Sequence, residues 1–176
     1  MRTVLSIAGV AVFVLTAAST AMAQGSGAEA RLKQLNITLP ADQAPAANFV
    51  NSVQAGKLLF LSGNTPGGQW PLKGKVGKDL TIEQGYESAR QTGLIMLGKI
   101  RTALGSLDRV KRVVKVLGMV NSADGFSDQP RVVNGFSDLM VEVFGEAIGK
   151  HARSAVGMAG LPGNAPVEVE MIVEVE

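Results

Sequence analysis

Apolar and charged residues follow a helical period over residues 81–104, the longest regular pattern of the chain. Apolar residues recur there every three or four positions with charged residues between them, as in an amphipathic helix with one buried face. Thr81 and Gln84 have the spacing of a capping box, and Gly105 follows the last apolar residue, Leu104. The pattern therefore predicts a helix that begins after Thr81 and ends before Gly105.

A second helical pattern lies in the C-terminal half of the chain. Its apolar positions recur at helical spacing from Val132 to Ala147. Pro130 falls in the expected first turn, and Ser127 or Asp128 precedes it as a capping residue. The sequence thus predicts a second amphipathic helix.

The other apolar segments have the character of strands. The turn-like residues 54–57 join the first two as a hairpin, and residues 58–61 are nearly all apolar, which predicts a central strand buried on both faces. Residues 167–175 alternate strictly between valine or methionine and mostly glutamate, as in a strand with one buried face. The five predicted strands cover residues 49–53, 58–61, 110–120, 153–158 and 167–175.

The order of these segments predicts an α+β fold. It reads β-β-α-β-α-β-β, a mixed sheet with two helices packed on one face. A glycine-rich loop over residues 62–80 separates the hairpin from the first long helix and is long enough to be functional. It lacks the pattern of a phosphate-binding P-loop.

The first 23 residues have the pattern of a secretory signal peptide. Arg2 precedes an apolar run, and the small residues that follow end in Ala21-Met22-Ala23. We expect cleavage after Ala23 and export of the protein, to the periplasm. An uncleaved membrane anchor is the alternative, but polar residues interrupt the run and it is shorter than a spanning helix needs, so we expect no stable membrane anchor.

Residues 24–176 are enough for one domain with a single core. We expect an N-terminal extension over residues 24–47, with a short helix over residues 28–35, and a folded domain over residues 48–176. The chain has no cysteine, which excludes disulfides and thiol chemistry, and its net charge is only +2. This near-neutral balance gives no reason to expect a nucleic-acid partner.

A basic run and a lone histidine each have a simple structural explanation. A basic run in the valine-rich segment, Arg109 to Lys115, suggests either RNA contact or a charged edge strand that prevents aggregation, and we favour the edge strand. His151 is the single histidine of the chain, so it cannot build a histidine-rich metal site, and no metal is expected. A surface position at the start of a strand is the simpler expectation for it.

Arg153 is the main candidate for chemistry. It opens a strand-like run of small and apolar residues, and a charge that enters a sheet costs several kcal/mol unless something pairs with it. Glu168 lies on the final strand, and the short connection between the strands would bring the two side chains together. Either they form a structural ion pair, or the guanidinium binds a carboxylate ligand beside a carboxylate that orients water.

The C-terminal part of the chain carries a recognisable signature. The run H-A-R-S-A-V-G-M-A-G-L-P-G-N-A-P-V-E-V-E-M, with L-S-G-N-T-P and V-N-G-F before it, resembles the RidA family, also called YjgF or endoribonuclease L-PSP. The resemblance covers about residues 44–176. It is greatest to the longer branch described as chorismate-mutase-like.

This resemblance implies a homotrimer whose sheets form a central barrel, with helices outside and ligand clefts at the subunit interfaces. RidA hydrolyses enamines and imines to 2-keto acids and ammonia, and the resemblance implies no cofactor. By position, Arg153 would grip the substrate carboxylate and Glu168 would place or activate water. Asn134 would line the cleft, Gly63 would offer backbone contact, and Phe49 would form the pocket wall.

Three residues depart from the family pattern. His151 stands where proline or alanine is usual, Ala155 where many members have cysteine, and Phe49 where tyrosine is frequent. Phenylalanine cannot donate or relay a proton, so the activity does not follow from the fold. A small-ligand-binding protein without catalysis, an endoribonuclease and a chorismate mutase are the alternatives on the same scaffold.

Overall fold

The computed structural model describes residues 27–45 and 47–176. The predicted signal peptide over residues 1–23 lies outside the described residues. Within the described part, no helix has the length and hydropathy needed to cross a membrane. The elements, in chain order, are α1 (Ala28–Gln34), β1 (Ser52–Ala55), β2 (Leu58–Asn64), α2 (Ile82–Leu104), η1 (Leu107–Arg109), β3 (Val110–Asn121), α3 (Gln129–Phe144), α4 (Glu146–Gly149), β4 (Ala152–Met158), η2 (Pro162–Asn164) and β5 (Val167–Val175).

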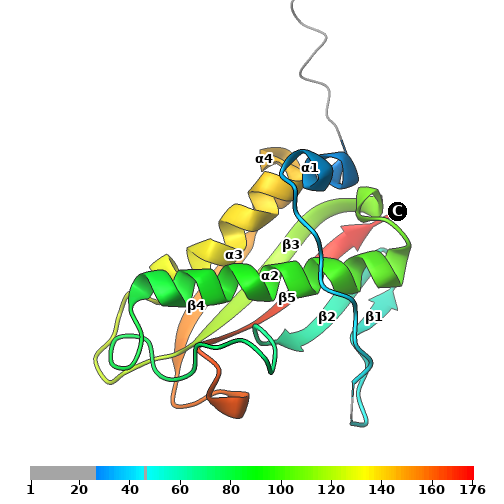
Figure 1. The fold of residues 1–176 in the computed structure, drawn as a ribbon. Helices are drawn as coiled ribbons and strands as arrows, with labels where there is room; N and C mark the ends of the chain where they lie inside the picture. The colour runs from blue at the N-terminus through cyan, green and yellow to red at the C-terminus, as the bar shows by residue number, and fades with distance from the viewer. Residues whose placement is uncertain (1–26, 46) are drawn as a thin grey trace, which may run out of the picture.

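The strands form one mixed sheet in the order β1-β2-β5-β3-β4. β3 and β4 are parallel, and the other neighbouring strands are antiparallel. Figure 1 shows α2 and α3 lying across the same face of this sheet. The predicted α+β fold, its element order and the two helices on one face are therefore confirmed.

The predicted ends of the first long helix are also confirmed. The Thr81 hydroxyl accepts from the Gln84 amide at 3.2 Å, and the Gln84 side chain accepts from the Thr81 amide at 2.9 Å. Gly105 ends the helix in the left-handed conformation, with φ of 81°, which glycine adopts without strain. In α3, Asp128 is the capping residue by position, but its side chain makes no capping bond, and Pro130 lies in the first turn.

β5 has the predicted alternation and supplies the centre of the core. Its valines and Met171 are buried toward the helices, at exposures of 2 % or less. The glutamates between them face the other side of the sheet, because successive side chains of a strand point to opposite faces.

Two expectations about the strands were wrong. β2 is buried on one face only: Leu58 and Phe60 are 36 % and 40 % exposed, because no described element covers the face opposite the helices. The basic run does not lie on an edge strand, since β3 is hydrogen-bonded to both β4 and β5. Its cations bind nearby groups instead: Lys111 contacts Glu176, and the Arg109 guanidinium donates to the Leu104 carbonyl at 2.8 Å.

The N-terminal extension is held against α2 by ion pairs. The Arg101 guanidinium binds both carboxylate oxygens of Glu29, at 2.6 and 3.0 Å, and Lys99 lies 3.1 Å from Asp42.

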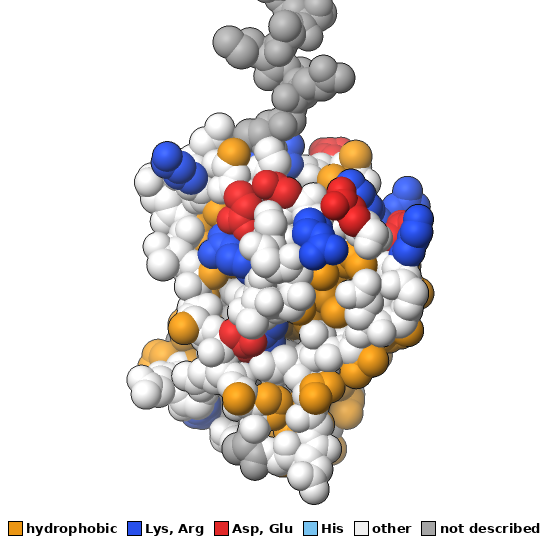
Figure 2. All heavy atoms as spheres, turned by 90° about the vertical axis from the view of Figure 1, so that its right-hand side faces the viewer, with side chains coloured by type: hydrophobic (Ala, Val, Ile, Leu, Met, Phe, Trp, Pro, Cys, Tyr) orange, Lys and Arg blue, Asp and Glu red, His pale blue; other side chains and the backbone are white. Residues whose placement is uncertain are grey.

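Figure 2 views the side of the molecule on which α1 and the C-terminus lie. Basic and acidic side chains are intermixed in its upper half, and hydrophobic side chains are exposed below them.

The crossing of α2 and α3 depends on Gly135. A Cβ atom at this position would overlap the Tyr86 carbonyl oxygen of α2. Since the obstacle is backbone rather than a flexible side chain, the helices would have to move apart to accept it. Gly135 therefore allows the close approach that fixes α3 on the sheet.

We expect Gly135→Ala to destabilise the fold by about 1–3 kcal/mol, because overpacking outweighs the better helix propensity of alanine. Urea unfolding of the variant and the wild type measures this difference. Gly68→Ala is the matched control, because open space surrounds that position. Its free energy of unfolding should stay within about 0.5 kcal/mol of that of the wild type. Equal midpoints for all three proteins would contradict the role given to Gly135.

Candidate functional site

Arg153 is the second residue of β4, the edge strand beside α3. Its side chain reaches the helix: Nη1 donates to the Asn134 side-chain oxygen at 2.9 Å and to the Ser137 hydroxyl oxygen at 3.0 Å. Nη2 makes one long bond, 3.4 Å, to the Pro130 carbonyl. All three acceptors are uncharged, so these contacts hold the guanidinium in place without neutralising it.

The expected contact between Arg153 and Glu168 does not form within one subunit. β3 lies between β4 and β5, so that Arg153 is opposite Val116 of β3 and Glu168 is opposite Met119. The connection after β4 crosses β3 before the chain enters β5, and the two side chains face opposite sides of the sheet. Among the described residues, no carboxylate lies within ion-pair distance of Arg153.

One edge of the Arg153 guanidinium remains available. Asn134 and Ser137 occupy Nη1, whereas Nε has no hydrogen-bond partner in the described part of the chain. The Nε and Nη2 donors lie on the same edge of the planar group, where a carboxylate binds with two parallel hydrogen bonds. The described residues thus leave this edge of an anchored guanidinium free for two parallel hydrogen bonds to a carboxylate.

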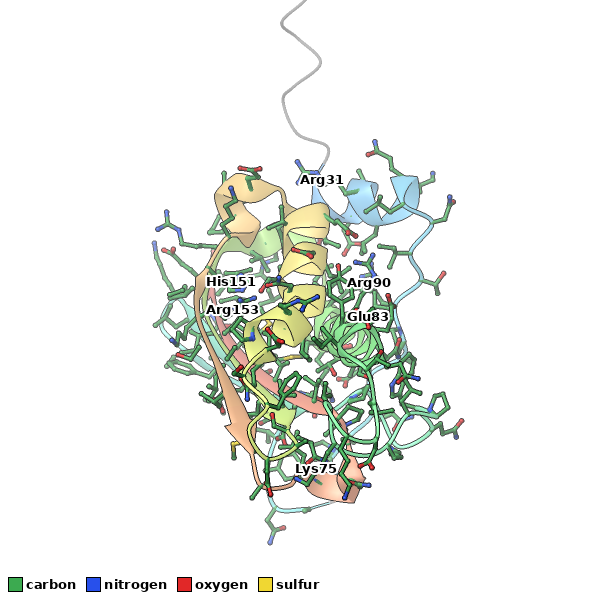
Figure 3. The ribbon with its side chains drawn as sticks, turned by 90° about the vertical axis from the view of Figure 1, so that its left-hand side faces the viewer. Arg31, Lys75, Glu83, Arg90, His151 and Arg153 are labelled. Carbon is green, nitrogen blue, oxygen red and sulfur yellow. The ribbon has the colours of Figure 1, made fainter. Side chains whose placement is uncertain are left out.

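His151 lies next to Arg153 and is not the simple surface residue that was expected. Its Nδ1 is 2.6 Å from the Gly149 carbonyl oxygen, and its Nε2 is 3.1 Å from the Ser137 hydroxyl. Burial of the ring, together with the positive charge of Arg153, lowers the pKa of His151, although the bond to Gly149 opposes this shift. Figure 3 shows His151 and Arg153 close together along β4, beside α3.

Ser137 was missed in the sequence, although a signal for it was present. Asn134 and Ser137 are three residues apart on α3, and His151 and Arg153 are two apart at the start of β4. These spacings place each pair on one face of its element. What the sequence did not show is that the two faces meet.

Glu168 and Gly63 form a second group. A Cβ atom at position 63 would overlap the Glu168 carboxylate, so a larger residue there would require that side chain to move. Partial burial raises the pKa of Glu168, and the neighbouring charge of Glu170 raises it further. The group lies on the face of the sheet without helices, away from Arg153.

Phe49 lies near the second group, on the same side of β3. It precedes β1 and is 56 % exposed. The Ser62 hydroxyl donates to the carbonyl of Val50 at 2.6 Å, which holds this segment against β2 close to Gly63. β1 and β4 are opposite edges of the sheet. Within one subunit the structure therefore joins Arg153 with Asn134 and Glu168 with Gly63, but it does not join the two groups.

Asn134 also lines an open groove of about 280 Å³ between the N-terminal halves of α2 and α3. Glu83, Glu87 and Arg131 line it together with Tyr86. The Tyr86 hydroxyl donates to Asp138 at 2.9 Å, and burial, with the contact to Asp138, raises the pKa of Tyr86. In the described residues, no cluster of three His, Cys, Asp or Glu side chains could hold a metal ion.

Comparisons with known proteins agree with this architecture. Protein TCP17 of Trypanosoma cruzi is 48% identical over 149 residues, which cover 82% of this chain and 92% of that protein. A 2-iminobutanoate/2-iminopropanoate deaminase of Dermatophagoides farinae is 29% identical over 140 residues, covering 80% of this chain and 95% of that enzyme. A solved structure from Shewanella oneidensis, described as "a putative endoribonuclease", has a TM-score of 0.81 at 30% identity, covering 85% of this chain and 100% of that chain.

A family model described as "YjgF/chorismate mutase-like, putative endoribonuclease" matches residues 29–175. The matched region contains all strands of the sheet and the two helices that cover it. The fold and the matched length thus lead to the same assignment: the chain belongs to the YjgF/chorismate-mutase-like family, the family of RidA and endoribonuclease L-PSP.

Proposed function

We propose that the protein binds a small carboxylate ligand at Arg153 and hydrolyses 2-imino acids to 2-keto acids and ammonia. The observation that carries the proposal is the guanidinium at the open edge of β4, anchored through Nη1 and without an acidic partner among the described residues. A positive charge held in this way favours an anionic ligand that binds with two hydrogen bonds. The deaminase of Dermatophagoides farinae supports a 2-imino acid as that ligand.

The proposal includes a homotrimer with the site between subunits. Arg153 and Asn134 lie at one edge of the sheet, whereas Glu168, Gly63 and Phe49 lie on the other side of β3. A second copy of the chain, placed against β4, would bring its Glu168 group to the first copy's Arg153. The large hydrophobic side chains exposed on β2 and β4 support such an assembly; they are Leu58, Phe60, Val156 and Met158.

In this site the ligand's carboxylate would bind the Nε–Nη2 edge of Arg153, opposite the nitrogen that holds Asn134 and Ser137, so its 2-carbon would point away from these two residues. Glu168 of a neighbouring copy would accept a hydrogen bond from the attacking water and so place it. Addition of water to the C=N bond gives a carbinolamine. Loss of ammonia from this intermediate leaves the 2-keto acid.

Non-catalytic ligand binding is the second candidate, since the Arg153 clamp is complete within one subunit and Glu168 is not part of it. Release of ammonia from a 2-imino acid separates the two. The endoribonuclease alternative has less support, because Arg109, Lys111 and Lys115 each bind groups of the same subunit. The proposal also includes export of the protein, which rests on the pattern of residues 1–23 alone.

We expect Arg153→Lys to weaken the binding of pyruvate, used as a 2-keto acid probe, by about tenfold or more. Lysine keeps the charge but loses the planar pair of donors, at a cost of about 1.5–3 kcal/mol for one charge-assisted hydrogen bond. Arg153→Ala should abolish binding and cost only about 1 kcal/mol of stability, because its partners are uncharged. Calorimetry measures the affinity, and urea unfolding measures the stability.

Arg112→Lys is the matched control, because Arg112 is an exposed arginine of β3, and it should bind pyruvate as the wild type does. Unchanged affinity in Arg153→Lys would remove Arg153 from the ligand site. A stability loss of about 3–5 kcal/mol in Arg153→Ala would instead indicate a structural ion pair.

We expect Glu168→Gln to leave the chain at least as stable as the wild type at pH 7. The pKa of Glu168 is higher in the folded chain than in the unfolded chain, so the folded state binds this proton more tightly. The wild type therefore loses stability relative to the variant as the pH rises through the folded pKa. Urea unfolding at pH 4 and pH 7 measures the difference between the two proteins, and a larger advantage of the variant at pH 4 would contradict it.

We expect residues 24–176 to form a trimer at micromolar concentration, measured by light scattering. Phe60→Glu should shift the protein toward monomers, because it places a charge on the apolar face that we propose as the subunit contact. Lys78→Glu, at an exposed loop position, should leave the trimer intact. A stable wild-type monomer would refute both the assembly and the shared site.

A further inference from the structure

Ser137 and His151 form a hydrogen-bonded pair beside Arg153 that the proposed function does not use. A carbonyl oxygen can only accept, so the 2.6 Å contact to Gly149 requires a hydrogen on Nδ1 of His151. In the neutral ring Nε2 then carries no hydrogen, and the 3.1 Å contact between Nε2 and Ser137 is a bond in which the serine hydroxyl donates. The same hydroxyl accepts from Nη1 of Arg153 at 3.0 Å, so that one oxygen atom separates the imidazole from the guanidinium.

The surroundings of His151 favour the neutral ring. Burial lowers its pKa, and the positive charge of Arg153 lowers it further, although the bond to Gly149 opposes both. The charged groups on the elements packed around the ring are engaged with other partners. They are Glu146 and Lys150 of α4, which pair with each other, Asp138 of α3, which accepts from Tyr86, and Lys115 of β3, which donates to Ser154. Arg153 is thus the charge that acts most directly on this imidazole.

The Ser137 hydroxyl can hold the ring in both protonation states. A serine oxygen has one hydrogen to donate and two lone pairs that accept. When His151 takes up a proton, Nε2 becomes a donor and Ser137 accepts from it. The second lone pair still accepts from Nη1 of Arg153, and the serine hydrogen can turn toward solvent because Ser137 is half-buried. Protonation therefore adds a positive charge beside Arg153 without removing an acceptor that holds the guanidinium.

We propose that His151 regulates carboxylate binding through its own protonation: an imidazolium beside Arg153 strengthens binding at the free Nε–Nη2 edge, and a neutral imidazole weakens it. The inference rests on the proposed function, since it needs a carboxylate at Arg153. It requires no contact between the ligand and His151, because the force between charges acts across the guanidinium. His151 is here a regulatory residue and takes no part in the hydrolysis.

The sign of the effect follows from the three charges involved. In the free protein the guanidinium of Arg153 opposes a second positive charge on His151. A bound carboxylate neutralises the guanidinium, so that the imidazole takes up a proton more easily. Ligand binding therefore raises the pKa of His151, and by linkage protonation of His151 raises the affinity for the ligand by the same factor. The affinity should rise as the pH falls through the range in which the ring titrates.

The separation of the charges limits the size of the effect. The carboxylate binds the edge of Arg153 opposite Nη1, whereas the imidazole lies beyond Ser137 on the Nη1 side. The two charges are therefore not in contact, and solvent at the open edge of β4 screens part of their attraction. We expect the affinity for a carboxylate to differ by about threefold to tenfold between the protonated and the neutral ring.

The single histidine of the chain allows its protonation to be followed directly by NMR. In residues 24–176 without a histidine tag, the imidazole nitrogen shifts at pH 8 should show the neutral tautomer with its hydrogen on Nδ1. Saturating pyruvate should raise the pKa of His151 in the wild type by about half a unit to one unit, and it should leave the pKa unchanged in Arg153→Ala. A pKa that pyruvate does not move although it binds would overturn the inference.

Calorimetry of pyruvate binding between pH 8 and pH 5 tests the other side of the linkage. The wild type should bind about threefold or more tightly at pH 5 and should take up protons on binding, counted in two buffers with different heats of ionisation. The side chain of His151→Gln can accept from Ser137 but does not titrate, so its affinity should lose this dependence. Glu168→Gln is the matched control, since it removes another titratable group of the proposed site, and it should keep the dependence.

These measurements distinguish failure of the inference from failure of the proposed function. If the wild type does not bind pyruvate at any pH, both are overturned. If it binds pyruvate and Arg153→Lys weakens the binding, but the wild type and His151→Gln show the same pH dependence, only the inference is overturned. A dependence that Glu168→Gln loses and His151→Gln keeps would also overturn it, because it would assign the regulation to Glu168.

Discussion

β3 is hydrogen-bonded to β5 on one side and to β4 on the other, and this position between the last two strands keeps Arg153 and Glu168 apart. Because β3 separates the last two strands, Arg153 and Glu168 are not on neighbouring strands. Their places in the alternation also turn Arg153 toward α3 and Glu168 toward the face without helices. Two side chains that a short connection was expected to pair are thus kept apart. The chain presents a cationic group on one face of the sheet and an acidic group on the other, and the proposed site between copies depends on this division.

The close packing of the helices on the sheet fixes the cationic group. Gly135 lets α3 approach α2, and α3 in turn carries Asn134 and Ser137 to Arg153. A guanidinium with three uncharged acceptors is held in position but keeps its charge, and such a group is more useful for binding an anion than for stabilising a fold. The same serine connects it to His151, so that the guanidinium and the imidazole share one hydrogen-bond network.

The sequence named candidate site residues but not their arrangement. The sequence singled out Arg153, Glu168, Asn134 and Gly63 by motif, and the structure places them in two separate pairs. Strand order caused the difference, because residues that are near in sequence come together only if their strands are neighbours. The surroundings of His151 were not predicted for a similar reason. Its contact with Ser137 of α3 forms only in the folded chain.

The sequence by itself determined the local elements, because hydrophobic period, capping residues and turn residues act over a few positions along the chain. It specified the ends of α2, the alternation of β5 and the α+β order of elements. Only the tertiary structure decided that β3 is an inner strand rather than an edge strand, that β2 has an uncovered apolar face, and that Ser137 meets His151 and Arg153. These features depend on which strands pair and which faces pack, and such long-range contacts have no signature in any short segment of the chain.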